Sequence, residues 1–114
     1  MTRIPIHPGE VLAEELAELG ATPTELARQI RVPHNRITQI IQGKRAVSGD
    51  TALRLGHWFA TSPAFWMNLQ SLYDVRLAEQ ANGRQIASLP RRPGAPALGE
   101  SETVAQVLAP SDLT

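Results

Sequence analysis

The stretch VPHNRITQIIQGKRAVS, residues 32–48, determines how the rest of the chain is interpreted. After Pro33 three isoleucines recur at helical spacing, which predicts a helix over about residues 34–42. Gly43 is a typical stop for such a helix. Its other positions, and those just after it, are polar or basic: Asn35, Arg36, Thr38, Gln39, Gln42, Lys44 and Arg45.

The residues before this stretch predict a second short helix, over about 23–30. Thr22 can cap it, Pro23 suits its first position, and Glu25 completes a capping box. Val32-Pro33 breaks it after two turns. Two short helices joined by a tight turn pose the helix-turn-helix hypothesis, in which the second helix lies in the DNA major groove.

Periodicity predicts three further helices around this pair: about 8–19, Ser48 to about Phe59, and Pro63 to about Gln80. The chain is therefore expected to be all-α, with a five-helix domain over residues 1–82. Most of the aromatic residues are expected in its core. The apolar residues of the last helix are Phe65, Trp66, Leu69, Leu72, Tyr73 and Leu77.

Residues 83–114 are expected to form a linker and tail. Five glycines and prolines fall between Pro90 and Gly99, so residues 83–99 are interpreted as irregular. Residues 101–109 carry a short apolar stripe, which is compatible with one or two turns of helix or with binding to a partner.

The net charge of zero, from 11 basic and 11 acidic residues, conceals a separation of charge along the chain. Residues 10–25 hold five glutamates and no cation, whereas residues 26–60 hold six cations and one aspartate. Because screening limits electrostatic interactions to about 8–10 Å, the basic half can bind phosphates despite the acidic helix.

Composition argues against several other classes of protein. The chain has no cysteine, no apolar run long enough to span a membrane, and no secretory signal, so a cytoplasmic location is expected. It shows no phosphate-binding glycine loop, no second metal ligand three or four residues from His34, and no histidine near a plausible Ser or Asp partner. We therefore expect no enzymatic activity, no metal or other cofactor, and no small-molecule substrate.

The polar face of the helix at 34–42 is either an ordinary solvated surface or a DNA-reading surface. For reading bases, Asn and Gln pair bidentately with adenine, and Thr meets the thymine methyl group. The expected base-reading residues are His34, Asn35, Thr38 and Gln39. The expected phosphate contacts are Thr22, Thr24, Arg36, Gln42, Lys44 and Arg45.

At this point the sequence resembles a known family. Residues 22–60 resemble the lambda-repressor/Cro-like (XRE) helix-turn-helix, and residues 7–77 resemble HigA/VapI-type antitoxins. The matching pieces are HPGEVLAEEL, TELARQI, NRITQIIQGKRAVSGDTALRL and SPAFWMNLQSLYDVRLA. The resemblance implies a lambda-repressor-like fold and a homodimer that represses its own operon. It also implies neutralisation of a HigB toxin, an mRNA-cleaving ribonuclease of the RelE-like fold.

Two residues depart from the family pattern. Arg31 stands where the turn often has glycine, and a left-handed conformation there costs on the order of 1 kcal/mol. Pro33 replaces the usual capping residue before the reading helix, and a cap contributes roughly 1 kcal/mol. The helix is therefore expected to begin later or to depend on tertiary packing.

Two alternatives remain beside the repressing antitoxin. One is a stand-alone XRE-type regulator with no toxin partner, and the other is a toxin-binding protein that does not bind DNA. A toxin gene immediately upstream discriminates between the first alternative and the antitoxin. The acidic helix at 8–19 and the tail at 100–114 are both candidate toxin-binding segments.

Overall fold

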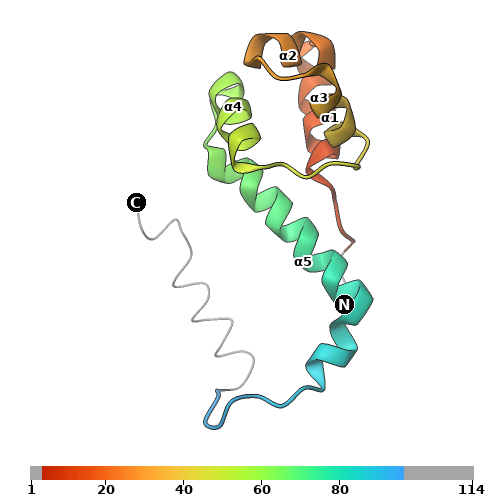
Figure 1. Ribbon diagram of the computed structural model, residues 1–114, viewed down its shortest axis with the longest axis vertical. Coiled ribbons are helices and arrows are strands. Elements are labelled where there is room, and N and C mark those ends of the chain that lie inside the picture. The colour runs from red at the N-terminus through yellow and green to blue at the C-terminus, as the bar shows by residue number, and fades with distance from the viewer. Residues whose placement is uncertain (1–3, 97–114) are drawn as a thin grey trace. The chain divides into compact units, whose positions relative to one another are not determined.

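The computed structural model describes residues 4–96, and within that range every regular element is an α-helix (Figure 1). This confirms the predicted all-α, five-helix fold. The third helix ends one residue before the predicted limit, and the fourth begins directly after Ser48. The helices are α1 (Pro8–Leu19), α2 (Pro23–Ile30), α3 (His34–Ile41), α4 (Gly49–Phe59) and α5 (Pro63–Ala87).

The helix-turn-helix pair α2 and α3 begins with the predicted threonine cap. The Thr22 hydroxyl accepts a hydrogen bond from the Glu25 amide at 3.1 Å, and Pro23 occupies the first helical position. Arg31 ends α2 in the left-handed conformation, with φ of 58°. Pro33 makes no side-chain cap, and α3 nonetheless begins at His34. The contacts at the start of α3 are instead the hydrogen bond from the Arg36 amide to the Pro33 carbonyl at 3.0 Å and the approach of His34 Nδ1 to the Thr24 hydroxyl of α2 at 3.2 Å.

The hydrophobic core draws residues from all five helices. Ala27 is buried in α2, as a small residue at the crossing of two helices must be, and Ile37 and Ile40 anchor the inner side of α3. Thr51 and Gln70 are buried polar residues of the same region. The buried apolar side chains are Leu12, Leu16, Leu26, Ala27, Ile30, Val32, Ile37, Ile40, Val47, Ala52, Leu55 and Trp66.

Helix α5 differs from the prediction in its length. It continues to Ala87, so residues 83–87 are helical and the predicted irregular linker begins later. One glycine within a helix costs only about 1 kcal/mol relative to alanine, which is why Gly83 does not end it. The first proline after Pro63 is Pro90, just beyond the helix end.

Helix α5 also differs from the prediction in the side chains that it buries. Trp66 and Gln70 are buried, whereas Phe65, Leu72 and Leu77 are exposed. The predicted apolar pattern mixed two sides of the helix. Trp66 and Gln70 lie one turn apart on the inner side, and Phe65 and Leu72 lie on another side.

The chain divides into two compact units, Met1–Gly83 and Arg84–Thr114. In the second unit, Ser88 donates to the backbone of the last turn of α5, and a turn follows in which the Ala95 amide donates to the Arg92 carbonyl at 3.1 Å. The short helix considered for residues 101–109 lies outside the described residues.

Candidate nucleic-acid interface

The outer side of α3 presents the four expected base-reading residues together. His34 and Asn35 are exposed, and Thr38 and Gln39 are partly exposed, one turn further along. Ile37 and Ile40 are buried on the opposite side. An α-helix places residues three and four apart on one face, so these four form one continuous polar surface.

Three of these side chains already have partners in the folded chain. The Gln39 side-chain oxygen accepts a hydrogen bond from Arg45 Nε at 2.9 Å. The Thr38 hydroxyl donates to the Asn35 carbonyl at 3.3 Å, and His34 Nδ1 lies 3.2 Å from the Thr24 hydroxyl. These contacts restrict the side-chain rotamers on the polar surface.

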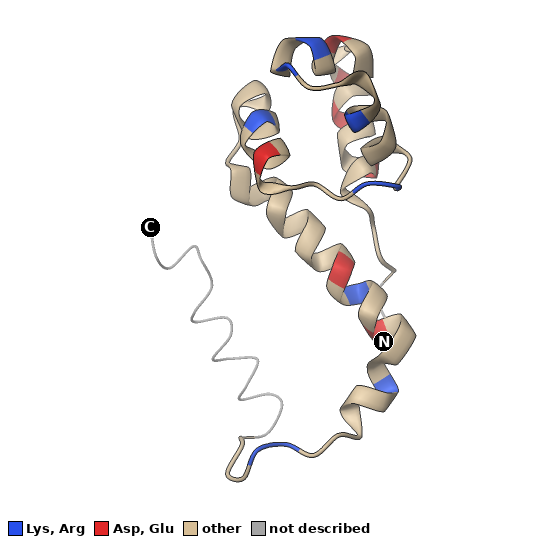
Figure 2. Ribbon diagram, in the orientation of Figure 1, with Lys and Arg blue, Asp and Glu red and all other residues tan. Residues whose placement is uncertain are grey.

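Two expected phosphate-contacting residues, Lys44 and Arg45, are exposed in the α3–α4 loop, residues 42–48. Gln42 is exposed at the start of the same loop, and Thr24 is exposed on α2. Figure 2 shows this basic loop near the N-terminal end of α1, whose acidic residues extend along the helix away from the loop. The separation of charge along the sequence is therefore only partial in space, because Glu10 and the Arg45 backbone both act on His7.

The side chain of Arg36, a residue of α3, is not free on the polar surface but is paired with a residue of α4. Its guanidinium donates to the Asp50 carboxylate at 3.0 Å, and Arg54 donates to the same oxygen at 2.9 Å. The hydrogen bond from Arg54, followed by that from Arg36, lowers the pKa of Asp50 below its ordinary value. Arg36 thus joins two helices, a role that the sequence analysis did not predict.

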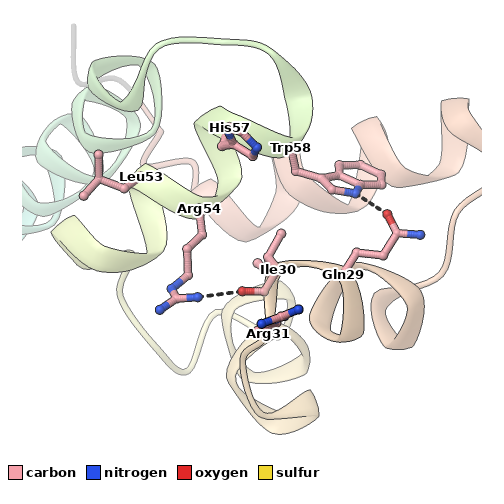
Figure 3. Close-up of a pocket in the computed structure, with 7 residues that line it drawn as sticks. All are labelled: Gln29, Ile30, Arg31, Leu53, Arg54, His57 and Trp58. Carbon is pink, nitrogen blue, oxygen red and sulfur yellow. Dashed lines mark hydrogen bonds between the residues drawn. The ribbon is translucent and has the colours of Figure 1, made fainter.

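Arg54 and Trp58 on α4 hold the C-terminal end of α2. Arg54 donates to the Ile30 carbonyl at 2.7 Å, and the Trp58 indole donates to the side chain of Gln29 (Figure 3). Both residues line a pocket of about 280 Å³ beside Arg31. Trp58, which is off the buried stripe of its helix, is half-buried and hydrogen-bonded instead of free.

The HPGE segment, residues 7–10, sets the position of α1 against α3. His7 Nδ1 accepts from the Gly9 amide at 2.9 Å, and the Glu10 carboxylate accepts from the His7 amide at 3.2 Å. This reciprocal pair is a capping box that the sequence analysis missed, because histidine is not a usual capping residue. Gly9 lies so close to α3 that a β-carbon would meet the Ile40 carbonyl oxygen.

His7 is buried at the start of α1, and burial lowers its pKa below the ordinary value. Glu10, Asp74 and a hydrogen bond with the Arg45 backbone act in the opposite direction and only partly offset the effect of burial. The neutral ring is required by its geometry, because Nδ1 accepts the Gly9 amide proton.

Stability is expected to fall as the pH drops below about 6.5, the ordinary histidine pKa. Between that value and the lowered pKa of folded His7, the unfolded chain binds more protons than the native chain. Thermal unfolding of the wild type and His7→Asn across this range tests the expectation, because asparagine caps helices but does not titrate. Equal pH dependence in both proteins would contradict it.

Within residues 4–96, no helix combines the length and apolar character that crossing a membrane requires. Across the same part of the chain, no group of three or more His, Cys, Asp or Glu side chains is arranged to hold a metal ion.

Comparisons with known proteins place the chain in a family, although no family model matches it. Virulence-associated protein I of Dichelobacter nodosus is 42% identical over 76 residues, which are 66% of this chain and 70% of that protein. A HigA-family addiction module antidote protein from Coxiella burnetii is 44% identical, with a TM-score of 0.76, over 78% of this chain and 99% of that one.

A third similar protein is the Pseudomonas aeruginosa antitoxin HigA, whose structure was solved with the higBA promoter. It is 44% identical, with a TM-score of 0.75, over 79% of this chain and 99% of that one. Because these identities extend over nearly the whole of both antitoxin structures, they cover the helix-turn-helix and the helices that pack on it. The chain belongs to the HigA family of helix-turn-helix antitoxins.

Proposed function

We propose that this protein is a DNA-binding antitoxin that represses its own operon as a homodimer and neutralises a HigB/RelE-like mRNA-cleaving toxin. The observation that carries the DNA-binding half is the polar outer side of α3, with the basic α3–α4 loop at its C-terminal end. Membership of the HigA family supports the antitoxin half.

The base-reading part of the proposal rests on the amide side chains of α3. Asn35 is exposed near the N-terminal end of the helix, which is the end that contacts base edges in helix-turn-helix proteins. Gln39 lies one turn further on and is oriented by its bond with Arg45. Both side chains offer the donor and acceptor pair that matches the major-groove edge of adenine.

The phosphate-binding part of the proposal uses the flanks of α3. Lys44 and Arg45 supply the charge, and Gln42 and Thr24 supply uncharged donors. The backbone amides at the start of α2 can also bind a phosphate. The Thr22 hydroxyl itself accepts a hydrogen bond from the Glu25 amide as the helix cap. Arg36 contributes positive potential from its place beside Asp50.

The variants Asn35→Ala and Lys44→Ala are expected to weaken binding in different ways. Asn35→Ala should cost roughly 1–3 kcal/mol at particular bases and relax specificity there. Lys44→Ala should weaken binding to all sequences alike and reduce the slope of log Kd on log salt by about one. Titrations on the upstream region and on scrambled duplexes, at several salt concentrations, separate the two effects. The same loss on both duplexes for Asn35→Ala would contradict its assignment as a base reader.

The homodimer is proposed to form through the outer stripe of α5, which consists of Phe65, Leu72 and Val75. All three side chains are exposed, and their spacing of seven and three residues keeps them on one side of the helix. Two helix-turn-helix units need a two-fold axis to place their reading helices in half-sites about one DNA turn apart. A self-complementary apolar stripe meets that need.

Co-expression with the product of the neighbouring upstream reading frame tests the complete proposal. The antitoxin should restore growth that the neighbour alone arrests and should co-purify with it, and a footprint should appear in the region upstream of the pair. A footprint without a toxic neighbour would indicate a stand-alone regulator. Neutralisation without a footprint would indicate a toxin-binding protein that does not bind DNA.

A further inference from the structure

Four residues from α5 and from the start of α1 lie against the α3–α4 loop. They are not part of the polar outer side of α3. The loop carries Lys44 and Arg45, and it also contains the buried Val47. The residues beneath it come from the start of α1 and from the middle of α5: His7, Gln70, Tyr73 and Asp74. The DNA-binding proposal assigns no role to these four.

Gln70 makes the central contact of this group. It is buried on α5, and its side-chain oxygen accepts a hydrogen bond from the Val47 amide at 2.7 Å. Its side-chain nitrogen donates to the Asp74 carboxylate at 2.9 Å, which fixes the orientation of the amide group. The C-terminal end of the loop is therefore attached to α5 by a buried and oriented hydrogen bond.

The rest of the loop is held from two other directions. The Lys44 amide donates to the Gln39 carbonyl at 2.8 Å, at the end of α3. The His7 ring packs edge-on against Tyr73, with 4.8 Å between the ring centroids, and the Arg45 backbone lies near enough to act on the pKa of His7. The main chain on both sides of the two cations is thus fixed, while their side chains remain exposed.

We propose that Gln70, oriented by Asp74, is a positioning residue for DNA binding: it holds the α3–α4 loop so that Lys44 and Arg45 reach the phosphates. Gln70 itself does not touch DNA, and this role rests on the DNA-binding function proposed above. A preformed loop matters because ordering a free one on binding reduces affinity. The role therefore predicts an effect on phosphate contacts rather than on base preference.

The variant Gln70→Leu tests the proposal, since leucine is similar in size and cannot accept the hydrogen bond from the Val47 amide. Kd should rise about tenfold on a duplex of the upstream region and on a scrambled duplex alike. The slope of log Kd on log salt should fall by about one. Gln80→Leu is the matched control, because it makes the same change at an exposed position of the same helix and should leave both quantities unchanged.

Two combined variants separate positioning from general destabilisation. In the Gln70→Leu background, Lys44→Ala should have little further effect on Kd, because the two changes remove the same contact. Gln70→Glu together with Asp74→Asn should restore binding. The carboxylate at position 70 can accept the hydrogen bond from the Val47 amide, and the side-chain amide at position 74 can donate a hydrogen bond to that carboxylate.

Asp74→Ala decides the matter if Gln70→Leu does not fold, because Asp74 is exposed and its loss removes the hydrogen bond that orients Gln70 while leaving Gln70 itself in place. Asp74→Ala, like Gln70→Leu, should lower the slope of log Kd on log salt. A folded Gln70→Leu or Asp74→Ala protein with the wild-type slope would overturn the positioning role. A wild-type protein that binds neither duplex would instead overturn the DNA-binding proposal.

Discussion

The variant Gly9→Ala is expected to lower the free energy of unfolding by about 3 kcal/mol or more, a larger effect than most single substitutions produce. A β-carbon at this position would lie 1.9 Å from the Ile40 carbonyl oxygen and 2.9 Å from the Ile41 α-carbon. Both are backbone atoms of α3, so no flexible side chain can move aside. Either α1 or the last turn of α3 must shift.

The measurement is chemical denaturation of Gly9→Ala beside Gly49→Ala. Gly49 also lies in the first turn of a helix, but a β-carbon there would meet nothing within 4 Å. Gly49→Ala should therefore retain wild-type stability or gain a little, by at most about 1 kcal/mol. Equal stability of the two variants would show that α1 and α3 do not approach as closely as described.

Replacing Leu72 and Val75 together by aspartate is expected to produce a monomer and to weaken binding to the upstream DNA by at least about 100-fold. Leu72 is 50% exposed and Val75 is 56% exposed on the outer stripe of α5. Charges there would be buried without partners in a dimer, at high cost. A monomer reaches one half-site only and loses the gain of about 10²–10⁴ that linked binding provides.

Analytical ultracentrifugation measures the mass, and footprinting measures the affinity. Leu53→Asp is the control, because Leu53 is 62% exposed on α4, outside the stripe, and its replacement should leave the mass of the proposed dimer unchanged. A Leu72→Asp/Val75→Asp protein that remains dimeric would place the dimer interface elsewhere. A monomeric variant with wild-type affinity would contradict the need for two-fold binding.

The helix bounds were largely predictable because local backbone chemistry sets them. Thr22 and Ser48 each accept a hydrogen bond from the amide three residues later. Arg31 adopts the left-handed conformation that the turn requires, although it lacks the freedom of glycine. Each of these features depends on neighbours within about one helical turn, so the sequence contains the needed information.

The candidate site was predictable in part for the same reason. The spacing of Ile37 and Ile40 identifies the inner side of α3, and the polar residues then occupy the outer side. The pattern did not reveal that Arg36 pairs with Asp50, because the two residues are 14 positions apart and meet only where α3 lies beside α4. The helical pattern therefore predicts Arg36 as a phosphate contact but does not predict its ion pair.

The sequence by itself determined the five helices found within residues 4–96, with a polar-faced helix between a capped helix and a basic loop. Periodicity and capping suffice for these features, because they arise from contacts within a few residues. Only the tertiary structure decided which side of α5 is buried, how closely Gly9 approaches α3, and that Gln70 holds the loop through Val47. Val47 and Gln70 are 23 positions apart, and a contact over that distance depends on how the helices pack rather than on any local pattern.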